Sequence, residues 1–363
     1  MKVKLIDPSG DVTPYDHALA AALARRGADV ELLTSRFLYG PLPAERGYAL
    51  TELFYPLATR FGLDARRRRR VAKALEHPLG MLALRKRLDE ADVAHYQWLR
   101  AGDAALIPPK RPRVMTVHNV LRRSGATGTA RKMDAVVVHT RHGARELTER
   151  VGVSPERIRV IPHGAFEHLL SLPGERPLPS ELAEVGGPVI LCFGTVRAYK
   201  GIDVLLRAFA AVEGAELWIV GRPLDTAMEP LHKLARAAQG RVRFVTRYLA
   251  EPEVPAFFKR ADLVVLPHRE VDQSGVLNVA LAFGKPIVMT SIGGFEEVAR
   301  DTGAGRLVAP EDPEALAGAI RELLADAGAR ERLGAAARAA AQGPYSWDEV
   351  ARRTLELYEE LTG

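Results

Sequence analysis

The sequence predicts an α/β protein of two Rossmann-like, doubly wound parallel-sheet domains that face each other across a cleft. Short apolar runs alternate with segments whose apolar residues recur at helical spacing, a pattern typical of parallel sheets covered by helices. The alternation occurs twice, on either side of a stretch rich in Pro, Gly and Glu. A chain of 363 residues also favours two domains over one.

The first domain is expected over residues 1–165. It opens with an apolar run at 2–7, and the segment 13–27 then carries apolar residues at helical spacing and ends at Gly27. Further apolar runs continue the alternation at 29–34, 92–96, 113–118, 134–140 and 157–163. Helical patterns between these runs predict that the strands are parallel.

The second domain is expected over residues 188–345 and repeats the scheme. Its apolar runs each end at Gly, Pro, Thr or a polar loop, and they lie at 188–194, 215–221, 241–246, 261–267, 285–290 and 305–310. Residues 166–187 have no clear period and are expected to form an interdomain linker. The last segment, 346–363, has an apolar stripe and is expected to be a helix that packs back on the first domain.

Composition excludes several classes of protein. Because 47% of the residues are apolar, the chain is not of the disordered class. The single cysteine, Cys192, excludes a disulfide framework and fits a reducing compartment. No apolar run reaches the length of about 18 residues that a membrane span needs, and the apolar opening is too brief for a signal peptide. We therefore expect a cytoplasmic protein that is at most peripheral on the inner face of the plasma membrane.

Positive charge is concentrated in the first half of the chain. The net charge is +6, but residues 1–165 alone hold 29 Lys and Arg against 17 Asp and Glu. Five consecutive arginines cover every side of a helix, so some of them must contact neighbours or a partner. A solvated helix face and an anionic membrane surface both fit this pattern, whereas no helix-turn-helix, zinc or RNA-binding signature supports nucleic acid. The patch comprises Arg66, Arg67, Arg68, Arg69, Arg70 and Lys73.

Two loops of the second domain carry the clearest chemistry. The first, 193–201, leaves a strand at Gly194 and meets a helix at Gly201, whose N-terminus attracts anions. Arg197 can bind phosphate oxygens with a forked geometry, and Lys200 can act as a mobile point charge. The loop therefore predicts a diphosphate site in which both cations stabilise a leaving diphosphate.

The second loop follows the apolar run 261–267. Ser274 is a natural N-cap for a helix that begins near Val276, and backbone amides there can bind phosphate. Glu270, or Asp272 instead, lies where a carboxylate can accept hydrogen bonds from sugar hydroxyls. No histidine or further carboxylate cluster supports a metal site there. Together the two loops predict a site for a sugar attached to a diphosphate.

The first domain offers a smaller set of candidates. Gly10 follows the first strand and would let the backbone approach a sugar or phosphate of the ligand. Tyr15 and Asp16 open the next helix, where contact with an acceptor and simple helix packing or capping both fit the sequence. His118 and Asn119 follow the strand at its carboxyl end, where a polar pair indicates a site rather than core.

In order and spacing, the segments of this chain resemble the retaining glycosyltransferases of the large family-four group (glycosyl transferases group 1), which have the two-domain GT-B fold. The resemblance covers nearly the whole chain. The motifs that carry it are DPSGDVTPYDHALAAAL, TVHNV, VVVHTRHG, IPHG, VRAYKG, IVGRP, QSGVL with its GKP partner, GGFEEV and YSWDEVA.

The resemblance implies that the second domain binds a donor and the first an acceptor. Arg197 and Lys200 match the family's diphosphate-binding pair, and Glu270 matches the first glutamate of its E-x7-E motif, which contacts the transferred sugar. Asn278 stands where the second glutamate would hold the ribose, which leaves the donor nucleotide open. His118 is expected near the reacting sugar, and the acceptor is expected near Tyr15, Asp16 and Asn119. The other expected donor contacts are Gly10, Gly221, Arg222, Gln273, Ser274, Gly275, Val276 and Leu277.

The resemblance further implies transfer of a hexose, with retention and without metal or other cofactor, from a UDP- or GDP-sugar to an acceptor hydroxyl. The basic first half favours a lipid-linked or anionic glycan acceptor. Two other classes stay open, namely a non-catalytic sugar-nucleotide-binding subunit, in view of Asn278, and a sugar-nucleotide epimerase. An NAD-dependent oxidoreductase is disfavoured because no G-x-G-x-x-G follows the first strand.

Overall fold

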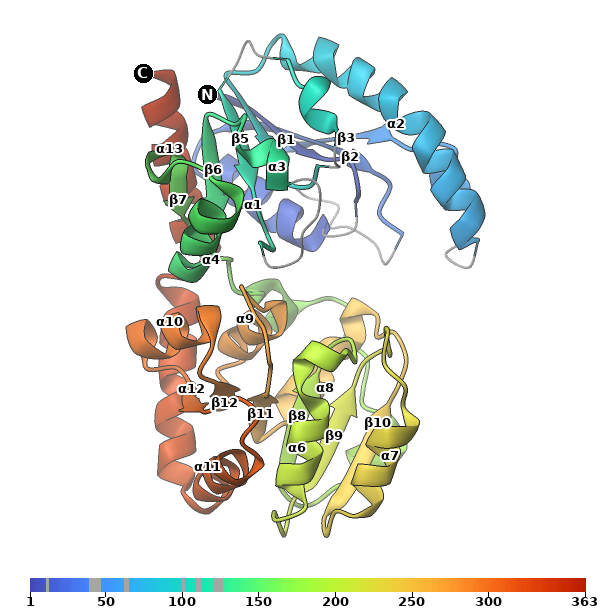
Figure 1. The fold of residues 1–363 in the computed structure, drawn as a ribbon, viewed down its shortest axis with the longest axis vertical. Helices are drawn as coiled ribbons and strands as arrows, with labels where there is room; N and C mark the ends of the chain where they lie inside the picture. The colour runs from blue at the N-terminus through green and yellow to red at the C-terminus, as the bar shows by residue number, and fades with distance from the viewer. Residues whose placement is uncertain (11–12, 39–46, 62–64, 100–101, 109–111, 121–126) are drawn as a thin grey trace. The chain divides into compact units, whose positions relative to one another are not determined.

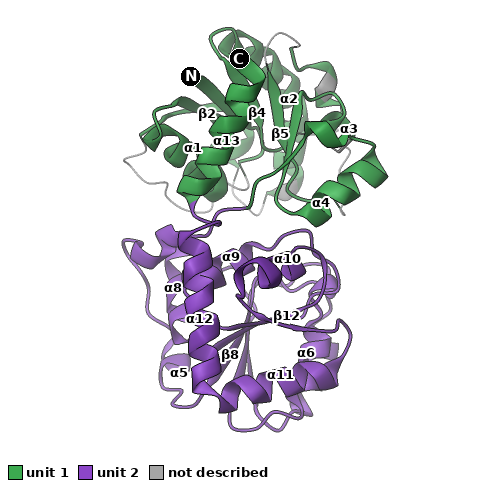
Figure 2. Cartoon of the chain, turned by 90° about the vertical axis from the view of Figure 1, so that its left-hand side faces the viewer, with its two compact units in different colours: residues 1–162, 347–363 green, residues 163–346 purple. Residues whose placement is uncertain are grey.

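The computed structural model describes residues 1–363 except 11–12, 39–46, 62–64, 100–101, 109–111 and 121–126, and except the side chains of Arg66, Ala104 and Thr127. The described chain divides into two compact units (Figure 2). Unit 1 comprises Met1–Pro162 and Trp347–Gly363, and unit 2 comprises His163–Ser346. None of the helices described is long and apolar enough to cross a membrane.

In its described part, unit 1 contains a seven-stranded parallel sheet in the order β3-β2-β1-β4-β5-β6-β7 (Figure 1). Most of these strands coincide with the predicted apolar runs, but β3 does not, because only its last residue is buried and the segment is mixed in polarity. The strands are β1 (Lys2–Asp7), β2 (Asp29–Ser35), β3 (Ala49–Phe54), β4 (Val93–Tyr96), β5 (Arg113–Thr116), β6 (Ala135–Val138) and β7 (Ile158–Val160).

Helices cover the sheet of unit 1, and the last helix of the chain is one of them. The hydroxyl oxygen of Tyr358 in that helix lies 2.6 Å from Nδ1 of buried His95. Leu19 and Leu23 share one apolar core with Val350. The helices are α1 (Thr13–Arg25), α2 (Arg66–Leu88), α3 (Thr127–Ala130), α4 (Arg141–Glu146) and α13 (Trp347–Thr362), with short helical turns at Ala58–Arg60, Asp103–Ala105, Leu147–Val151 and Pro155–Arg157.

Unit 2 repeats the architecture, with a six-stranded parallel sheet in the order β10-β9-β8-β11-β12-β13. The predicted parallel α/β class is confirmed for both units. The strands are β8 (Val189–Phe193), β9 (Glu216–Val220), β10 (Arg241–Val245), β11 (Leu263–Leu266), β12 (Ile287–Thr290) and β13 (Arg306–Val308). The helices are α5 (Ser180–Ala183), α6 (Ile202–Phe209), α7 (Glu229–Arg236), α8 (Val254–Arg260), α9 (Gly275–Ala282), α10 (Gly293–Thr302), α11 (Pro313–Ala325) and α12 (Ala327–Gln342), with turns at Glu167–Ser171, Ala198–Lys200 and Glu251–Glu253.

The predicted linker 166–187 is instead part of unit 2. Leu169 and Leu182 are buried in its apolar core. A guanidinium nitrogen of Arg260 donates to the carbonyl oxygen of Val185 at 2.8 Å. The prediction failed because a segment without regular period can still be held by scattered apolar anchors, and such anchors are recognisable only from their contacts.

The strand orders identify where each sheet can bind a ligand. In unit 2 the chain fills the sheet outward from β8 in one direction and from β11 in the other, so the topological switch point lies between these two strands. In unit 1 the switch point lies between β1 and β4. Ligands of open parallel sheets bind beyond the carboxyl ends of the strands at such points. The loops after β8 and β11 are the two that the sequence singled out.

Candidate functional site

The loop after β8 is shaped by two glycines with left-handed backbone angles. Gly194 has φ +99° and Gly201 has φ +63°. A Cβ atom at Gly201 would lie 1.9 Å from the carbonyl oxygen of Pro267, so only glycine lets this loop approach the chain that follows β11. The two loops of the candidate site are therefore in direct backbone contact.

Lys200 is buried between these loops. Its Nζ atom lies 3.5 Å from the carbonyl oxygen of Phe193, and a Cβ atom at Gly194 would lie 2.5 Å from it and 3.0 Å from Cγ2 of Val276. Among the described residues, no carboxylate forms an ion pair with Lys200. Burial lowers the pKa of Lys200, against the opposing effect of Cys192 and with a smaller effect of the charge of Arg197, to about 8. A buried ammonium group with this surrounding is suited to receive an anion.

Arg197 and the loop after β9 border the same place. A guanidinium nitrogen of Arg197 lies 3.5 Å from a carboxylate oxygen of Asp225, whose side chain is exposed. Gly221 has φ +146°, and a Cβ atom there would lie 2.2 Å from the carbonyl oxygen of Gly194. Arg222 is exposed, and its carbonyl oxygen accepts from the backbone N–H of Val196 at 3.0 Å. Arg197 is therefore held near the strand ends by a weak surface pair that a ligand can replace.

The loop after β11 ends at the N-terminus of α9. The Ser274 hydroxyl accepts a hydrogen bond from the backbone N–H of Leu277 at 3.4 Å, as the N-cap prediction required. Gly275 and Val276 form the first helical positions and are partly exposed, and Gln273 precedes them. Their backbone N–H groups and the helix dipole favour an anion here.

The polar side chains of this second loop differ in exposure. Glu270 is exposed, whereas Asp272 is 7% exposed. Asn278 lies within α9 and is 3% exposed, and its backbone N–H donates to the carbonyl oxygen of Ser274. Of the two carboxylates considered for sugar hydroxyls, Glu270 is the accessible one.

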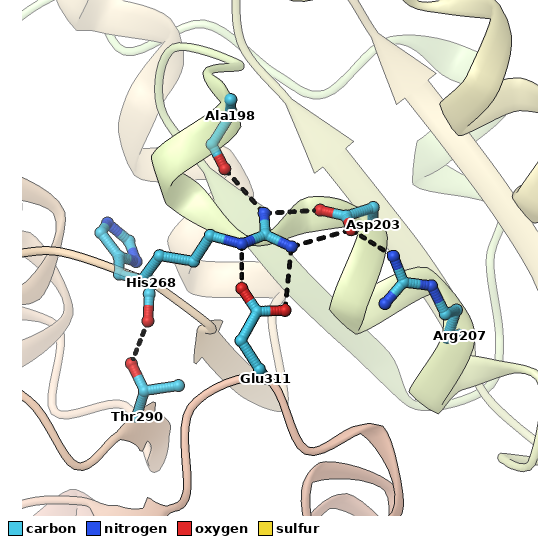
Figure 3. A network of polar contacts seen from close by, with 7 residues as sticks. Ala198, Asp203, Arg207, His268, Thr290 and Glu311 are labelled. Atoms are coloured by element: carbon cyan, nitrogen blue, oxygen red, sulfur yellow. Dashed lines mark hydrogen bonds and ion pairs between the residues drawn. The ribbon is translucent and has the colours of Figure 1, made fainter.

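Arg269 clamps the two loops together, and the sequence analysis did not predict it (Figure 3). Its guanidinium group donates to both carboxylate oxygens of Asp203 at 2.8 and 2.9 Å, to the carbonyl oxygen of Ala198 at 2.8 Å, and to Glu311. The hydrogen bonds that Arg269 donates to Asp203 and Glu311 raise its pKa. Its backbone N–H donates to the carbonyl oxygen of Tyr199 at 2.7 Å. Arg269 therefore fixes the turn that carries Lys200.

In unit 1, His118 belongs to a chain of polar groups beyond the ends of β4, β5, β6 and β7. Its Nε2 atom lies 3.2 Å from Oε1 of Gln97, and its Nδ1 atom lies 3.1 Å from Nε2 of His139. Nδ1 of His139 lies 3.0 Å from the carbonyl oxygen of Ile161. The ring of Trp98 stacks on His118, with 4.8 Å between ring centroids. His118, which was expected to belong to a polar site at this strand end, therefore has Gln97, His139 and Trp98 as its neighbours.

Tyr15 and Asp16 are buried, which favours packing over contact with an acceptor. The Tyr15 ring lies edge-on to His118 and Trp347, with centroid distances of 4.7 and 5.1 Å. Burial and the nearby Asp7 carboxylate raise the pKa of Asp16 well above its usual range.

Asp7 in turn holds the loop that contains Gly10. Its carboxylate accepts from the backbone N–H of Ser9 at 2.9 Å and from that of Gly10 at 3.1 Å. Gly10 has φ +65°, and a Cβ atom there would lie 2.4 Å from the hydroxyl oxygen of Ser35. Asp16 is therefore buried beside the carboxylate that holds this loop.

Lys73 does not lie with the arginine patch to which the sequence analysis assigned it. Its Nζ atom lies 4.9 Å from the centroid of the Tyr55 ring and 3.4 Å from the carbonyl oxygen of Ser9. The residue projects from the side of α2 that packs on unit 1, so its charge is directed at the loop after β1. Asn119 is partly exposed beside His118.

Within the described ranges, no group of three or more His, Cys, Asp or Glu could hold a metal ion. A pocket of about 610 Å³ in unit 2 is lined by Glu184, Gly187, Glu216 and Arg241, which lie at the amino ends of the strands. That pocket therefore belongs to the opposite edge of the sheet.

Comparison with known proteins identifies the family of this chain. The family model described as Glycosyl transferases group 1 matches residues 187–326, and the model described as Glycosyltransferase Family 4 matches residues 15–165. A D-inositol 3-phosphate glycosyltransferase from Xylanimonas cellulosilytica is 30% identical, over 98% of this chain and 92% of the relative. The chain belongs to the glycosyltransferases of group 1 and family 4.

Solved structures agree on the fold of the glycosyltransferase. Sucrose-phosphate synthase from Thermosynechococcus elongatus has a TM-score of 0.72 at 20% identity, with 99% of each chain covered. HepE from Anabaena, solved in complex with UDP, has a TM-score of 0.72 at 18% identity, covering 99% of this chain and all of the other. The predicted GT-B fold and family resemblance are confirmed.

The structure of the glycosyltransferase also shows which neighbours sequence reasoning missed. Arg269 follows β11 directly, but nothing in its local sequence indicates that Asp203 and Glu311 converge on it. Gln97 was detectable, because it follows the predicted strand 92–96 as His118 follows the next. Nothing in the local sequence linked His139 to His118, because their contact depends on the pairing of β5 with β6.

Proposed function

We propose that this glycosyltransferase transfers a hexose from a UDP-sugar to a hydroxyl of a phosphate-bearing acceptor, with retention of anomeric configuration. The observation that carries the donor half is the convergence of Arg197, buried Lys200 and the N-terminus of α9 at the switch point of unit 2. Three sources of positive potential around one place suit a diphosphate. UDP is favoured over GDP because HepE was solved with UDP.

In the proposed reaction, the bond between the anomeric carbon and the diphosphate oxygen breaks, and the acceptor oxygen bonds to that carbon on the same face. The acceptor's proton passes to an oxygen of the departing diphosphate. Arg197 and Lys200 stabilise the charge that develops on the diphosphate, and Glu270 accepts hydrogen bonds from the sugar hydroxyls. No protein base is needed, which agrees with the neutral, internally bonded His139 beside His118.

The acceptor half of the proposal rests on unit 1 and on the relatives. The Xylanimonas protein is named for an inositol phosphate. Lys73 brings an ammonium group within 3.4 Å of the carbonyl oxygen of Ser9, next to Gly10. A phosphate group on the acceptor would find this cation at the carboxyl end of β1. We propose a lipid-linked or anionic acceptor that carries such a phosphate.

Two measurements test the donor. Thermal unfolding is followed with UDP, GDP, ADP, TDP and their common sugars, where a ligand at about 100 times its Kd adds about 2.7 kcal/mol of stability. Transfer is then measured with labelled UDP-sugar and inositol phosphate. Arg197→Ala and Lys200→Ala should each lower turnover by about 10²–10³. Arg236→Ala, which removes an exposed arginine of α7, is the matched control.

The outcomes separate the alternatives. Near-normal turnover in both Ala variants would remove these loops from the donor site. Binding of UDP-sugar without transfer or hydrolysis would favour the non-catalytic subunit, and interconversion of free UDP-sugars would favour the epimerase.

We also propose that transfer is metal-independent, since Arg197 and Lys200 supply positive charge at the diphosphate. Turnover that survives exhaustive treatment with EDTA is the expected result.

For location we propose the cytoplasmic side of a membrane and a peripheral association with anionic lipid. The support is the excess of basic residues in 1–165 and their density around α2.

A further inference from the structure

Helix α2 is apolar on two opposite faces, and one of them is exposed. Met81, Leu84 and Leu88 are buried against unit 1, with exposed fractions of 3% or less. On the other side, four large apolar side chains are exposed by half or more. They are Val71 at 57%, Leu75 at 71%, Leu79 at 68% and Leu82 at 50%.

The exposed side chains form one continuous stripe. At 3.6 residues per turn, positions 71, 75, 79 and 82 fall within an arc of about 80°. Ala74, Pro78 and Ala83 are exposed as well and add to the same surface. A water-facing helix of a soluble protein normally presents polar residues there, so a stripe of this kind marks a surface that binds something apolar. Figure 1 shows α2 along the outer side of unit 1.

Basic residues flank the stripe at both ends of the helix. Arg67, Arg68 and Arg70 precede it and are exposed, and Arg85 and Lys86 follow it. The acidic residue of α2, Glu76, is already engaged, because its carboxylate accepts from the backbone N–H groups of Leu57 and Ala58 at 2.7 and 2.9 Å.

We propose that the outer face of α2, defined by Val71, Leu75, Leu79 and Leu82 with its flanking basic residues, docks on the surface of an anionic lipid bilayer. The helix lies in the plane of the interface, its apolar stripe enters the boundary between head groups and acyl chains, and the basic residues contact lipid phosphates. This inference deepens the proposed peripheral location, and it is independent of which donor and acceptor the glycosyltransferase uses.

Charge decides between a bilayer and a second copy of the chain as the occupant. Pairing of two α2 helices would bring Arg67, Arg68 and Arg70 of one copy against Arg85 and Lys86 or the same arginines of the other, in either orientation. Like charges across an interface oppose association. An anionic bilayer instead offers negative charge to both ends of the helix and apolar volume to its middle.

The test is sedimentation of the full chain with vesicles of phosphatidylcholine alone and with about 30% phosphatidylglycerol. We expect binding to the anionic vesicles, weakened by salt, and little binding to the neutral ones. Leu75→Ser/Leu79→Ser should weaken binding by about tenfold or more per side chain. Arg67→Glu/Arg68→Glu should weaken it by more than fivefold per residue, since about fivefold is the effect of one basic residue near the surface.

The matched controls make the same kinds of substitution at exposed residues of unit 2. Leu170→Ser/Tyr248→Ser removes two apolar side chains that are 47% and 48% exposed. Arg236→Glu/Arg332→Glu reverses two exposed arginines. Both should bind vesicles like the parent chain. A tryptophan placed by Leu79→Trp should be quenched by lipids brominated near the head group, which shows that the stripe enters the bilayer.

The proposal fails if the chain ignores anionic vesicles, or if the two serine substitutions leave binding unchanged. It also fails if these substitutions dissociate an oligomer in light-scattering measurements, because the stripe then binds a second copy. Transfer to a soluble acceptor, assayed without vesicles, should be unchanged in the α2 variants. If the parent chain transfers sugar but does not bind vesicles, this inference alone fails. If the parent chain binds vesicles but does not transfer sugar, the proposed function alone fails.

Discussion

Nδ1 of His118 lies 3.1 Å from Nε2 of His139, and this contact determines the tautomers of both rings. A carbonyl oxygen can only accept, so Nδ1 of His139 donates its proton to Ile161. Burial lowers the pKa of His139 to about 4, so the ring is neutral at pH 7 and its Nε2 atom accepts. Nδ1 of His118 is therefore the donor in this contact.

Replacement of His139 should affect turnover more than donor binding. His139→Leu removes the acceptor for Nδ1 of His118 and should lower kcat by about tenfold, the equivalent of one lost hydrogen bond. The Kd of UDP should stay unchanged, because the donor loops belong to unit 2. His139→Gln retains an acceptor oxygen and should recover part of the loss. A purely structural role would instead show equal loss in both variants together with a lower unfolding temperature.

Lys200→Met should stabilise the glycosyltransferase while weakening its affinity for UDP. The folded protein holds Lys200 at a pKa of about 8, below the ordinary lysine value of 10.5, so the charged form disfavours folding at neutral pH. Removing that charge should add about 1–3 kcal/mol to the free energy of unfolding at pH 7, and less as the pH approaches 10. Urea unfolding at pH 7 and pH 9.5 measures both values. Lower stability of Lys200→Met at pH 7 would contradict the assignment of a buried, uncompensated cation.

The affinity for UDP should fall as the pH rises above about 8. A bound diphosphate favours the charged form of Lys200, so its pKa is higher in the complex than in the free protein, where it is about 8. Between these two pKa values binding takes up a proton, and Kd should rise by about tenfold per pH unit. Below pH 8, Lys200 is charged in both the free and the bound protein, so it should not make the affinity depend on pH. Calorimetric titration from pH 7 to 10 tests this, with Lys200→Met expected to lose the slope.

Arg269→Met should weaken both stability and donor binding. The substitution removes the Arg269 donor from Glu311 and from the carbonyl oxygen of Ala198, which keeps only the backbone N–H of Gly201, and it releases the turn that carries Lys200. We expect a loss of about 2 kcal/mol in the free energy of unfolding and about tenfold weaker binding of UDP. Arg306→Met is the matched control, since Arg306 pairs only with exposed Glu322 at 3.3 Å in the described chain. Equal effects of the two substitutions would show that Arg269 has no special role in the loop.

Acid should destabilise unit 1 more steeply than unit 2. Burial lowers the pKa of His95 to about 3 and that of His139 to about 4, both in unit 1, and that of His268 in unit 2 to about 3. The unfolded chain binds these protons from pH 6.5 downward while the folded chain does not, so stability falls with pH between about 6.5 and 4. The slope is at most about 2.7 kcal/mol per pH unit for two histidines and about 1.4 for one. Hydrogen exchange of each unit from pH 7 to 4.5 measures the difference, and parallel losses in both units would contradict it.

Much of the fold and the donor half of the site could be predicted from local sequence. Each buried parallel strand is a short apolar run, and Gly194, Arg197, Lys200 and Ser274 lie directly at the ends of two such runs. Because parallel strands end at one edge of a sheet, position along the chain was enough to group them. The segment 166–187 and the strand Ala49–Phe54 were missed, since neither has a regular apolar pattern.

Sequence by itself determined the parallel α/β class, the family, and the residues that end each strand, because these depend on period, spacing and residue type along the chain. Only the tertiary structure decided what surrounds those residues. It buried Tyr15 and Asp16, turned Lys73 toward Ser9, joined Arg269 to Asp203 and Glu311, and left the leucines of α2 exposed. The physical reason is that burial, ion pairing and a shifted pKa arise between groups brought together from distant parts of the chain, and no local pattern specifies those meetings.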